Sequence, residues 1–364
     1  MFDDTDPLSY DVESREISKM PFLEELKFLF KNLNIDDVGA YLLISTCYRV
    51  LPSNLFVNFI YILFGIISAF SLYRISKEFM SIKYAKLCSI AFSLSSFVIY
   101  YHSSGRKESI MIMLIILFFD YYYQFIKTRK IKNLFVSVFF VLQLILFRVP
   151  IIFFIIASIL VSSMLGFKNN KIRIPLVVLS ILLFIIFNRY FQYSLNRFLH
   201  GGEISNILKG REMMIKGGIR FTYLTNIIAQ FVGPFPTIFP MREKETLVFY
   251  APGLFFRCFI SIPFFLGIIS VVKNKEKLLH PIILFTMFEM ISLISILEGL
   301  ELRKSLPHFP FIYIIAFYYM DKYDLNKLDT RKYLSPIKIN FLLILIFVII
   351  LVWNLRINIS IYSV

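Results

Sequence analysis

Apolar runs close to the length of a bilayer crossing recur along this chain and decide what it can fold into. A helix needs roughly 20 apolar residues to cross the hydrocarbon core of a membrane. Of the 364 residues, 58% are hydrophobic and only 17% are charged, and a soluble globule could not bury so much apolar surface. The sequence therefore predicts an all-α, polytopic integral membrane protein.

We predict about ten transmembrane helices in two groups. Residues 54–190 form a first bundle of six segments, and residues 251–364 form a second group of four. A long polar external loop, residues 191–250, separates the two groups. The predicted segments cover residues 54–73, 84–100, 109–126, 134–147, 150–165, 174–190, 251–272, 278–297, 307–320 and 339–354.

The first part of the chain, residues 1–53, is acidic and is predicted to lie outside the membrane. Within it, Pro21–Phe30 has the spacing of a short amphipathic helix, and Val38–Val50 reads as an interfacial stretch. Asp36 and Asp37 precede this stretch, and we interpret them as a helix N-cap pair rather than as catalytic groups. An external segment of this length without an export signal is awkward to insert, so we expect a further helix upstream.

Basic residues gather in alternate connectors and thereby predict the topology. With Lys86, these connectors contain 19 Lys and Arg residues against five acidic ones, and this net charge of +14 is nearly the whole formal charge of +15. Cytoplasmic loops of membrane proteins are rich in Lys and Arg, so the charge indicates membrane topology rather than nucleic-acid binding. The connectors predicted to be cytoplasmic are residues 74–83, 127–133, 166–173, 273–277 and 321–338.

Several familiar kinds of site have no signature in the sequence. Cys47, Cys88 and Cys258 lie far apart, so the cysteines indicate neither a disulfide framework nor a zinc site. No phosphate-binding loop, hydrolase elbow or metalloprotease motif is present. A divalent cation remains an open possibility.

Charged residues on the predicted outer face form the candidate site. Arg106 and Lys107 join two membrane helices there, against the charge bias, and could bind phosphate oxygens. An ordinary charged turn is the alternative. Arg148 lies in an apolar hairpin with Val149 and Pro150, where an Arg is costly unless it faces a polar cavity or a partner. Reaching the lipid headgroups is the alternative for this side chain.

The long loop adds further cations on the same side. Arg211 and Arg220 stand beside glycines, which suits a pyrophosphate held against exposed amides, although simple headgroup binding fits as well. Gly233–Pro236 is predicted to form a rigid turn. Arg303 is another base on the outer side, and His308 after it could be only an interfacial residue.

Four acidic residues need separate interpretations. Asp4 and Asp6 could act as a general base or hold a divalent cation, and a solvated acidic tail is the alternative. Asp120 is near the inner end of its segment and is expected to reach water. Glu289 is deeper in its segment and needs a partner, for which Arg257 is the candidate.

A series of short motifs, in order and on one predicted side, resembles the bacterial GT-C-type membrane glycosyltransferases and the related polymerases of O-antigen and capsule synthesis. The motifs are Asp6-Pro7 with Tyr10, Gly105–Glu108, Arg148-Val149-Pro150, Phe231–Pro236 and Arg303 with Pro307–Pro310.

This resemblance implies a glycosyl transfer at the outer face of the bacterial cytoplasmic membrane, with a polyprenyl-phosphate-linked sugar or a polyprenyl-diphosphate-linked glycan as substrate. It implies that Asp4 or Asp6 is the base. Membrane lipid and other polysaccharide-assembly proteins are the expected partners, and nucleic acid is not. It also implies that the lipid phosphates are held by Arg106, Lys107, Arg148, Arg211, Arg220 and Arg303.

Three functions fit this interpretation. A repeat-unit polymerase and a single-sugar transferase are not separable by sequence. A lipid-linked oligosaccharide flippase, which makes no bond, is the alternative from another class. A flippase is expected to distribute polar residues through a central cavity, whereas here they concentrate on one face, which favours the enzyme.

Overall fold

The computed structural model describes most of the chain, namely residues 5–33, 35–166, 174–182, 218–233, 236, 246–295, 302–324 and 336–362. Within these ranges every regular element is a helix and no β-strand occurs. The predicted all-α class is therefore confirmed.

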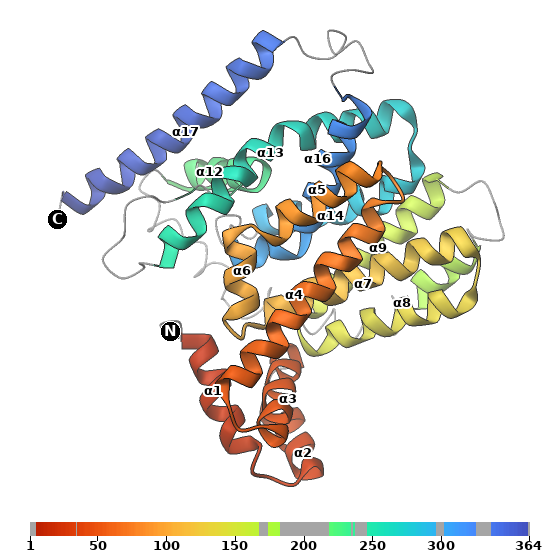
Figure 1. Ribbon diagram of the computed structural model, residues 1–364, viewed down its shortest axis with the longest axis vertical. Coiled ribbons are helices and arrows are strands. Elements are labelled where there is room, and N and C mark those ends of the chain that lie inside the picture. The colour runs from red at the N-terminus through yellow and green to blue at the C-terminus, as the bar shows by residue number, and fades with distance from the viewer. Residues whose placement is uncertain are drawn as a thin grey trace.

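Three helices at the N-terminal end form a separate small unit (Figure 1). They are α1 (Thr5–Ile17), α2 (Phe22–Asn32) and α3 (Ile35–Val50). Helix α2 confirms the amphipathic helix predicted for Pro21–Phe30. It turns Glu25 and Leu29 inward, while Phe22, Leu23 and Phe30 stay exposed.

Four helices have the length and apolarity of membrane spans. They are α4 (Asn54–Ser76), α7 (Lys107–Thr128), α13 (Thr246–Asn274) and α14 (His280–Ser295), which follows the short η2 (Lys277–Leu279). They agree with the segments predicted for residues 54–73, 109–126, 251–272 and 278–297.

The segment predicted for residues 84–100 is broken rather than straight. It consists of α5 (Ile82–Ser93) and α6 (Ser96–Ser103), which meet at an angle of 59° and make a fifth span if counted together. At the break, the Ser95 hydroxyl bonds the Ala91 carbonyl and the Tyr313 hydroxyl. Side-chain bonds of this kind compete with the helical ladder and bend helices.

The remaining predicted segments are helical but shorter in their apolar part. They include α8 (Ile131–Gln143) with η1 (Leu144–Leu146), α9 (Val149–Gly166), α16 (Phe309–Lys322) and α17 (Pro336–Tyr362). Residues 174–182 are also helical. The count of about ten spans stays a prediction, since only four or five of the described helices are long and apolar enough to cross a membrane.

The interval predicted as a long external loop, residues 191–250, contains regular structure. Helix α12 (Gly218–Val232) lies inside this range, and α13 already begins at Thr246. Helix α12 ends where Gly233 adopts a φ of 122°, a conformation that favours glycine. Arg257 of α13 then donates to the carbonyls of Val232 and Gln230, both at 3.3 Å.

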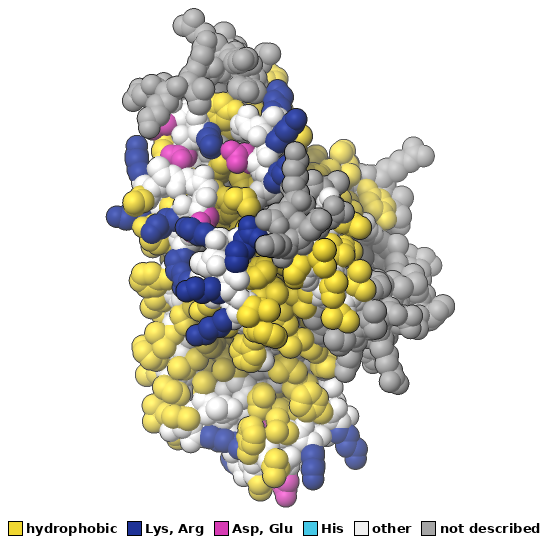
Figure 2. Space-filling model, turned by 90° about the vertical axis from the view of Figure 1, so that its right-hand side faces the viewer, with side chains coloured by type: hydrophobic (Ala, Val, Ile, Leu, Met, Phe, Trp, Pro, Cys, Tyr) yellow, Lys and Arg dark blue, Asp and Glu magenta, His cyan; other side chains and the backbone are white. Residues whose placement is uncertain are grey.

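Polar side chains concentrate at both ends of α7, which is about 33 Å long at 1.5 Å per residue and so matches a bilayer core. At its first end, Lys107 forms an ion pair with Asp37. At its last end, Lys127 lies 3.0 Å from Glu78. Figure 2 shows a band of hydrophobic side chains between two regions that carry Lys and Arg.

Four of the five basic connectors contribute to the second of these ends. Besides Lys127 and Glu78, Lys322 lies 3.5 Å from Glu276, and Asp321 accepts a 2.9 Å bond from the Ser81 amide. Asp120 lies near this end. The prediction that its side chain reaches water is wrong. Asp120 is 3% exposed, its carboxylate lies 3.3 Å from Nε of Arg74, and Gln124 donates to it at 3.0 Å.

Candidate functional site

Two aspartates of α3 bind the first residues of α7 and α9. Asp37 accepts a 2.8 Å bond from the Tyr10 hydroxyl of α1 and pairs with Lys107 of α7. The Lys107 ammonium also donates to the backbone carbonyl of Asp36 at 3.2 Å. The Asp36 carboxylate accepts the Val149 amide at 3.1 Å. Asp36 thus caps a helix, as its type suggests, but it caps α9 rather than its own helix.

These contacts bring together four segments that are separate in the sequence. We call Tyr10, Asp36, Asp37, Lys107 and Arg148 the acidic-pair cluster. The half-buried Arg148 immediately precedes α9, and its charge acts on Asp36. The structure therefore unites two of the predicted phosphate-binding residues, Lys107 and Arg148, with an acidic pair for which the sequence predicts only a helix cap.

Burial and nearby cations have opposite effects on the pKa of Asp36. Burial raises the pKa of Asp36 above its ordinary value, and the charge of Asp37 adds to this rise. The Val149 amide, Lys107 and Arg148 act in the opposite direction but do not cancel the effect. Folding therefore favours the protonated carboxyl of Asp36.

We expect Asp36→Asn to remove a pH dependence of stability. A pKa that folding raises gives stability that is present at low pH and is lost as the pH rises through the folded-state pKa. Wild type should therefore lose stability relative to Asp36→Asn, whose amide oxygen can still accept the Val149 bond, as the pH rises from acidic to neutral. Thermal unfolding of both proteins in lipid nanodiscs across this range checks the sign; a difference that grows toward low pH contradicts it.

Arg106 has a different environment from its neighbour Lys107. It is 6% exposed, and its guanidinium lies over the rings of Tyr100 and Tyr101, at 5.6 and 5.2 Å. The preceding Gly105 has a φ of 68°, which reverses the chain before α7 and favours glycine. Cation–π contacts thus hold Arg106 against α6.

A second polar cluster is buried between α13, α14 and the short η3 (Leu306–His308). Glu289 of α14 places its carboxylate 3.3 Å from Nδ1 of His308. Arg257 was the predicted partner of Glu289, but it caps α12 instead, and its guanidinium lies 5.3 Å from the ring centre of Phe309. The prediction failed because the partner comes from a turn that its sequence marked only as interfacial.

Arg303 lies in the short helix that directly precedes η3. It is half-buried in α15 (Leu302–Ser305), and Ser305 at the end of that turn accepts a 2.8 Å bond from the Gln230 amide of α12. For the remaining predicted site residues, the structure describes the backbone alone or nothing. Arg220 lies in the first turn of α12 and Asp6 in the first turn of α1, both with undescribed side chains, while Asp4 and Arg211 lie outside the described residues.

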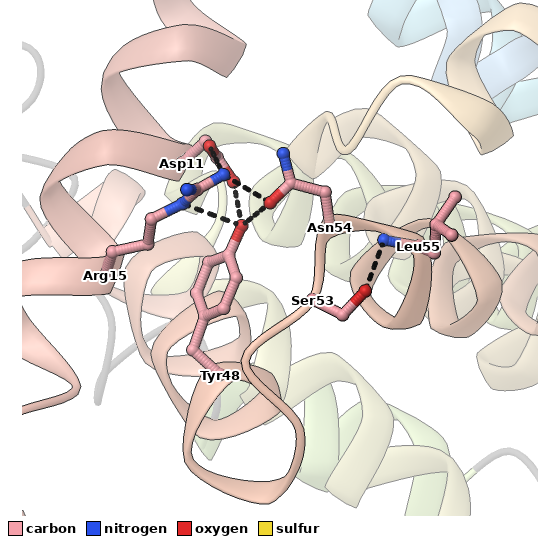
Figure 3. A network of polar contacts seen from close by, with 6 residues as sticks. All are labelled: Asp11, Arg15, Tyr48, Ser53, Asn54 and Leu55. Carbon is pink, nitrogen blue, oxygen red and sulfur yellow. Dashed lines mark hydrogen bonds and ion pairs between the residues drawn. The ribbon is translucent and has the colours of Figure 1, made fainter.

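The N-terminal unit is tied to α4 by a separate polar network (Figure 3). Arg15 lies 2.8 Å from the carboxylate of Asp11 and donates through Nε to the Tyr48 hydroxyl at 3.3 Å. Tyr48 and Arg15 both donate to Asn54, the first residue of α4. These bonds fix α1 and α3 against the start of a membrane-length helix, so this network positions the unit that carries Asp36 and Asp37.

The part of the chain that the structure describes contains no group of three or more His, Cys, Asp or Glu side chains suited to a metal ion. The open question of a divalent cation therefore gains no candidate ligands there.

These observations define a class: an all-α protein with four or five apolar helices long enough to cross a membrane, and with clustered ionisable groups among them. Comparisons with known protein families, with curated proteins and with solved structures found no match.

Proposed function

We propose that this chain is a membrane enzyme of bacterial surface-polysaccharide synthesis, located in the cytoplasmic membrane. It transfers a glycosyl group from a polyprenyl-phosphate-linked sugar or polyprenyl-diphosphate-linked glycan at the outer face. Repeat-unit polymerisation and single-sugar transfer are both forms of this reaction, which breaks the bond between the anomeric carbon and a phosphate oxygen.

The observation that supports the proposal is the position of the acidic-pair cluster. It lies at the end of α7 opposite the end where the basic connectors meet. If those connectors are cytoplasmic, as the charge bias favours, the cluster lies near the outer headgroups. The phosphate of a lipid-linked donor occupies the same level.

Lys107 and Arg148 supply the charges that such a phosphate needs. An ammonium attracts phosphate as a point charge, whereas a guanidinium can bind two of its oxygens at once. Positive charge held in place before the reaction stabilises the departing phosphate. The resemblance gives the role of base to Asp4 or Asp6; the backbone of Asp6 lies one helical turn before Tyr10 of the cluster.

Deletion of the gene, followed by gel analysis of the surface polysaccharide, tests the proposal. The deletion is complemented with wild type, Lys107→Met, Arg148→Ala, Asp4→Asn and Asp6→Asn. Lys130→Met is the matched control, because Lys130 is exposed at the basic end. We expect the deletion strain to make only single-repeat chains if the protein is a polymerase, or chains that lack one sugar if it is a transferase. Wild type and the control Lys130→Met should restore normal polysaccharide, whereas Arg148→Ala should not.

Other results of the same experiment contradict the proposal. A complete absence of repeat units from the surface, with lipid-linked glycan retained inside, supports the flippase. A normal polysaccharide ladder in the deletion strain, or in every complemented variant, contradicts the proposed outer-face site.

A further inference from the structure

Helix α2 turns large apolar side chains away from the protein. Glu25 and Leu29 are fully buried, and Glu25 pairs with Arg49 of α3. Residues four apart share one face of an α-helix, so Glu25 and Leu29 define the side of α2 that faces α3. Phe22 and Phe30, on the adjoining face, are exposed. The helix thus buries a glutamate and exposes phenylalanines.

The lysines of α2 lie on the side opposite the buried residues. Successive residues are rotated by about 100° around a helix with 3.6 residues per turn, which places exposed Lys27 and Lys31 away from Glu25 and Leu29. The apolar face between these two sides consists of Phe22, Leu23, Leu26 and Phe30. A helix with lysines beside a face of Phe and Leu is suited to lie in the plane of a membrane surface.

The exposed apolar surface continues from α2 to α4. The Arg49 guanidinium lies 5.6 Å from the ring centre of Phe22, so the start of α2 lies beside the end of α3. The chain leaves α3 through the exposed Val50 and Leu51 and enters α4, where Leu55 is 80% exposed. Figure 2 shows hydrophobic side chains at the surface of its lower end, beside Lys and Arg.

The lipid bilayer is the partner that fits this continuous surface. One face of α4 is exposed along Leu55, Phe59, Ile62 and Ile66, which recur at spacings of three and four residues. Since α4 has the length and apolarity of a membrane span, this face is suited to contact with acyl chains. The apolar face of α2 extends the same surface, and its lysines suit the anionic headgroups of lipids.

The N-terminal unit holds α2 beside the ends of two membrane-length helices. Tyr48 of α3 and Arg15 of α1 donate to Asn54, where α4 begins (Figure 3). Asp37 of α3 pairs with Lys107, where α7 begins. The ends of membrane-spanning helices lie where the hydrocarbon core meets the headgroups, so these bonds place α3 and the adjoining α2 near that level.

We propose that α2 lies in the plane of the membrane surface, with Phe22, Leu23 and Phe30 inserted among the acyl chains of the lipids. Lys27 and Lys31 lie at the level of the lipid phosphates. The apolar face of such a helix is buried about 5–10 Å into the boundary between headgroups and acyl chains. This anchor fixes the height of α3, and with it the acidic-pair cluster, relative to the membrane. The inference concerns the contact with lipid alone and does not depend on glycosyl transfer.

Tryptophan fluorescence tests the depth of α2. The single tryptophan, Trp353, is replaced by Phe, and one tryptophan is introduced by Leu23→Trp, by Phe30→Trp or, as the matched control on the charged side of α2, by Lys31→Trp. Each full-length protein is reconstituted into vesicles of phosphatidylcholine and phosphatidylglycerol, with or without bromine atoms on the upper part of the acyl chains. Iodide, present on both sides of the vesicle membrane, is the quencher in water.

We expect Leu23→Trp and Phe30→Trp to emit at shorter wavelength than Lys31→Trp and to lose fluorescence in brominated lipid. Iodide should quench Lys31→Trp more strongly than either of them. Leu23 and Phe30 are exposed, so the substitutions leave the packing of α2 intact, and unchanged hydrogen exchange in α3 checks this.

Two results would overturn the proposal. If iodide quenches all three variants equally and brominated lipid quenches none, α2 faces water. If neither quencher reaches the tryptophans of Leu23→Trp and Phe30→Trp, the apolar face is covered by protein, such as a second copy of this chain, rather than by lipid. Neither result bears on the polysaccharide made by the complemented deletion strain, so the proposed function is tested separately.

Discussion

Replacing Arg49 with methionine is expected to open the N-terminal unit. Arg49 pairs with the carboxylate of Glu25, which is fully buried, and also donates to the Met20 carbonyl at 2.7 Å. Removing one partner of a buried ion pair leaves an uncompensated charge, at a cost of about 3–5 kcal/mol. Hydrogen exchange of the amides in α2 and α3, measured in nanodiscs, should show a fall of this size in the free energy of opening.

Two variants give this expectation its controls. Lys19→Met removes the exposed pair with Glu16, whose side chains are both 69% exposed, and should change the free energy by no more than about 1 kcal/mol. Combining Arg49→Met with Glu25→Leu removes both charges and should recover most of the loss. Equal exchange rates in Arg49→Met and Lys19→Met would show that the pair does not hold the unit together.

Reversing the charge of Lys107 is the second change with a large expected effect. Lys107→Asp places a third carboxylate beside Asp36 and Asp37 and removes a charged hydrogen bond worth about 1.5–3 kcal/mol. The contact between α3 and the start of α7 should weaken, with faster hydrogen exchange in α3. Polysaccharide synthesis by the complemented deletion strain should fall below detection.

The reciprocal change separates structure from function. Asp37→Lys combined with Lys107→Asp restores one positive and one negative charge at the same pair of sites, so slow exchange in α3 should return. Function should stay absent if Lys107 contacts the donor phosphate. Recovery of both exchange protection and polysaccharide would mean that Lys107 acts only by holding α3.

Local patterns in the sequence predicted local structure well. The apolar spacing of residues 21–30 indicated helix α2, and Pro150 in an apolar run indicated the break between α8 and α9. Both features depend on neighbouring residues alone. The break between α5 and α6 was missed because its cause includes a bond from Ser95 to the distant Tyr313.

The candidate site was only partly predictable for the same reason. Lys107 and Arg148 stood out because cations are unusual on the predicted outer side. The bond between Asp36 and the Val149 amide joins residues 113 positions apart, and no periodicity encodes such a contact. Glu289 signalled its need for a partner, but His308 reaches it through η3, a turn whose direction depends on tertiary packing.

Glycosyl transfer at the outer face requires the acidic-pair cluster to lie on the outer side of the membrane. Single cysteines test this at two exposed positions: Ser103, the last residue of α6 shortly before α7 begins, and Thr128, the last residue of α7. The buried Cys47, Cys88 and Cys258 are replaced by alanine in this background. A membrane-impermeant maleimide should label Ser103→Cys in intact spheroplasts, and should label Thr128→Cys only after permeabilisation. The reverse pattern would put the cluster in the cytoplasm and contradict an outer-face glycosyl transfer.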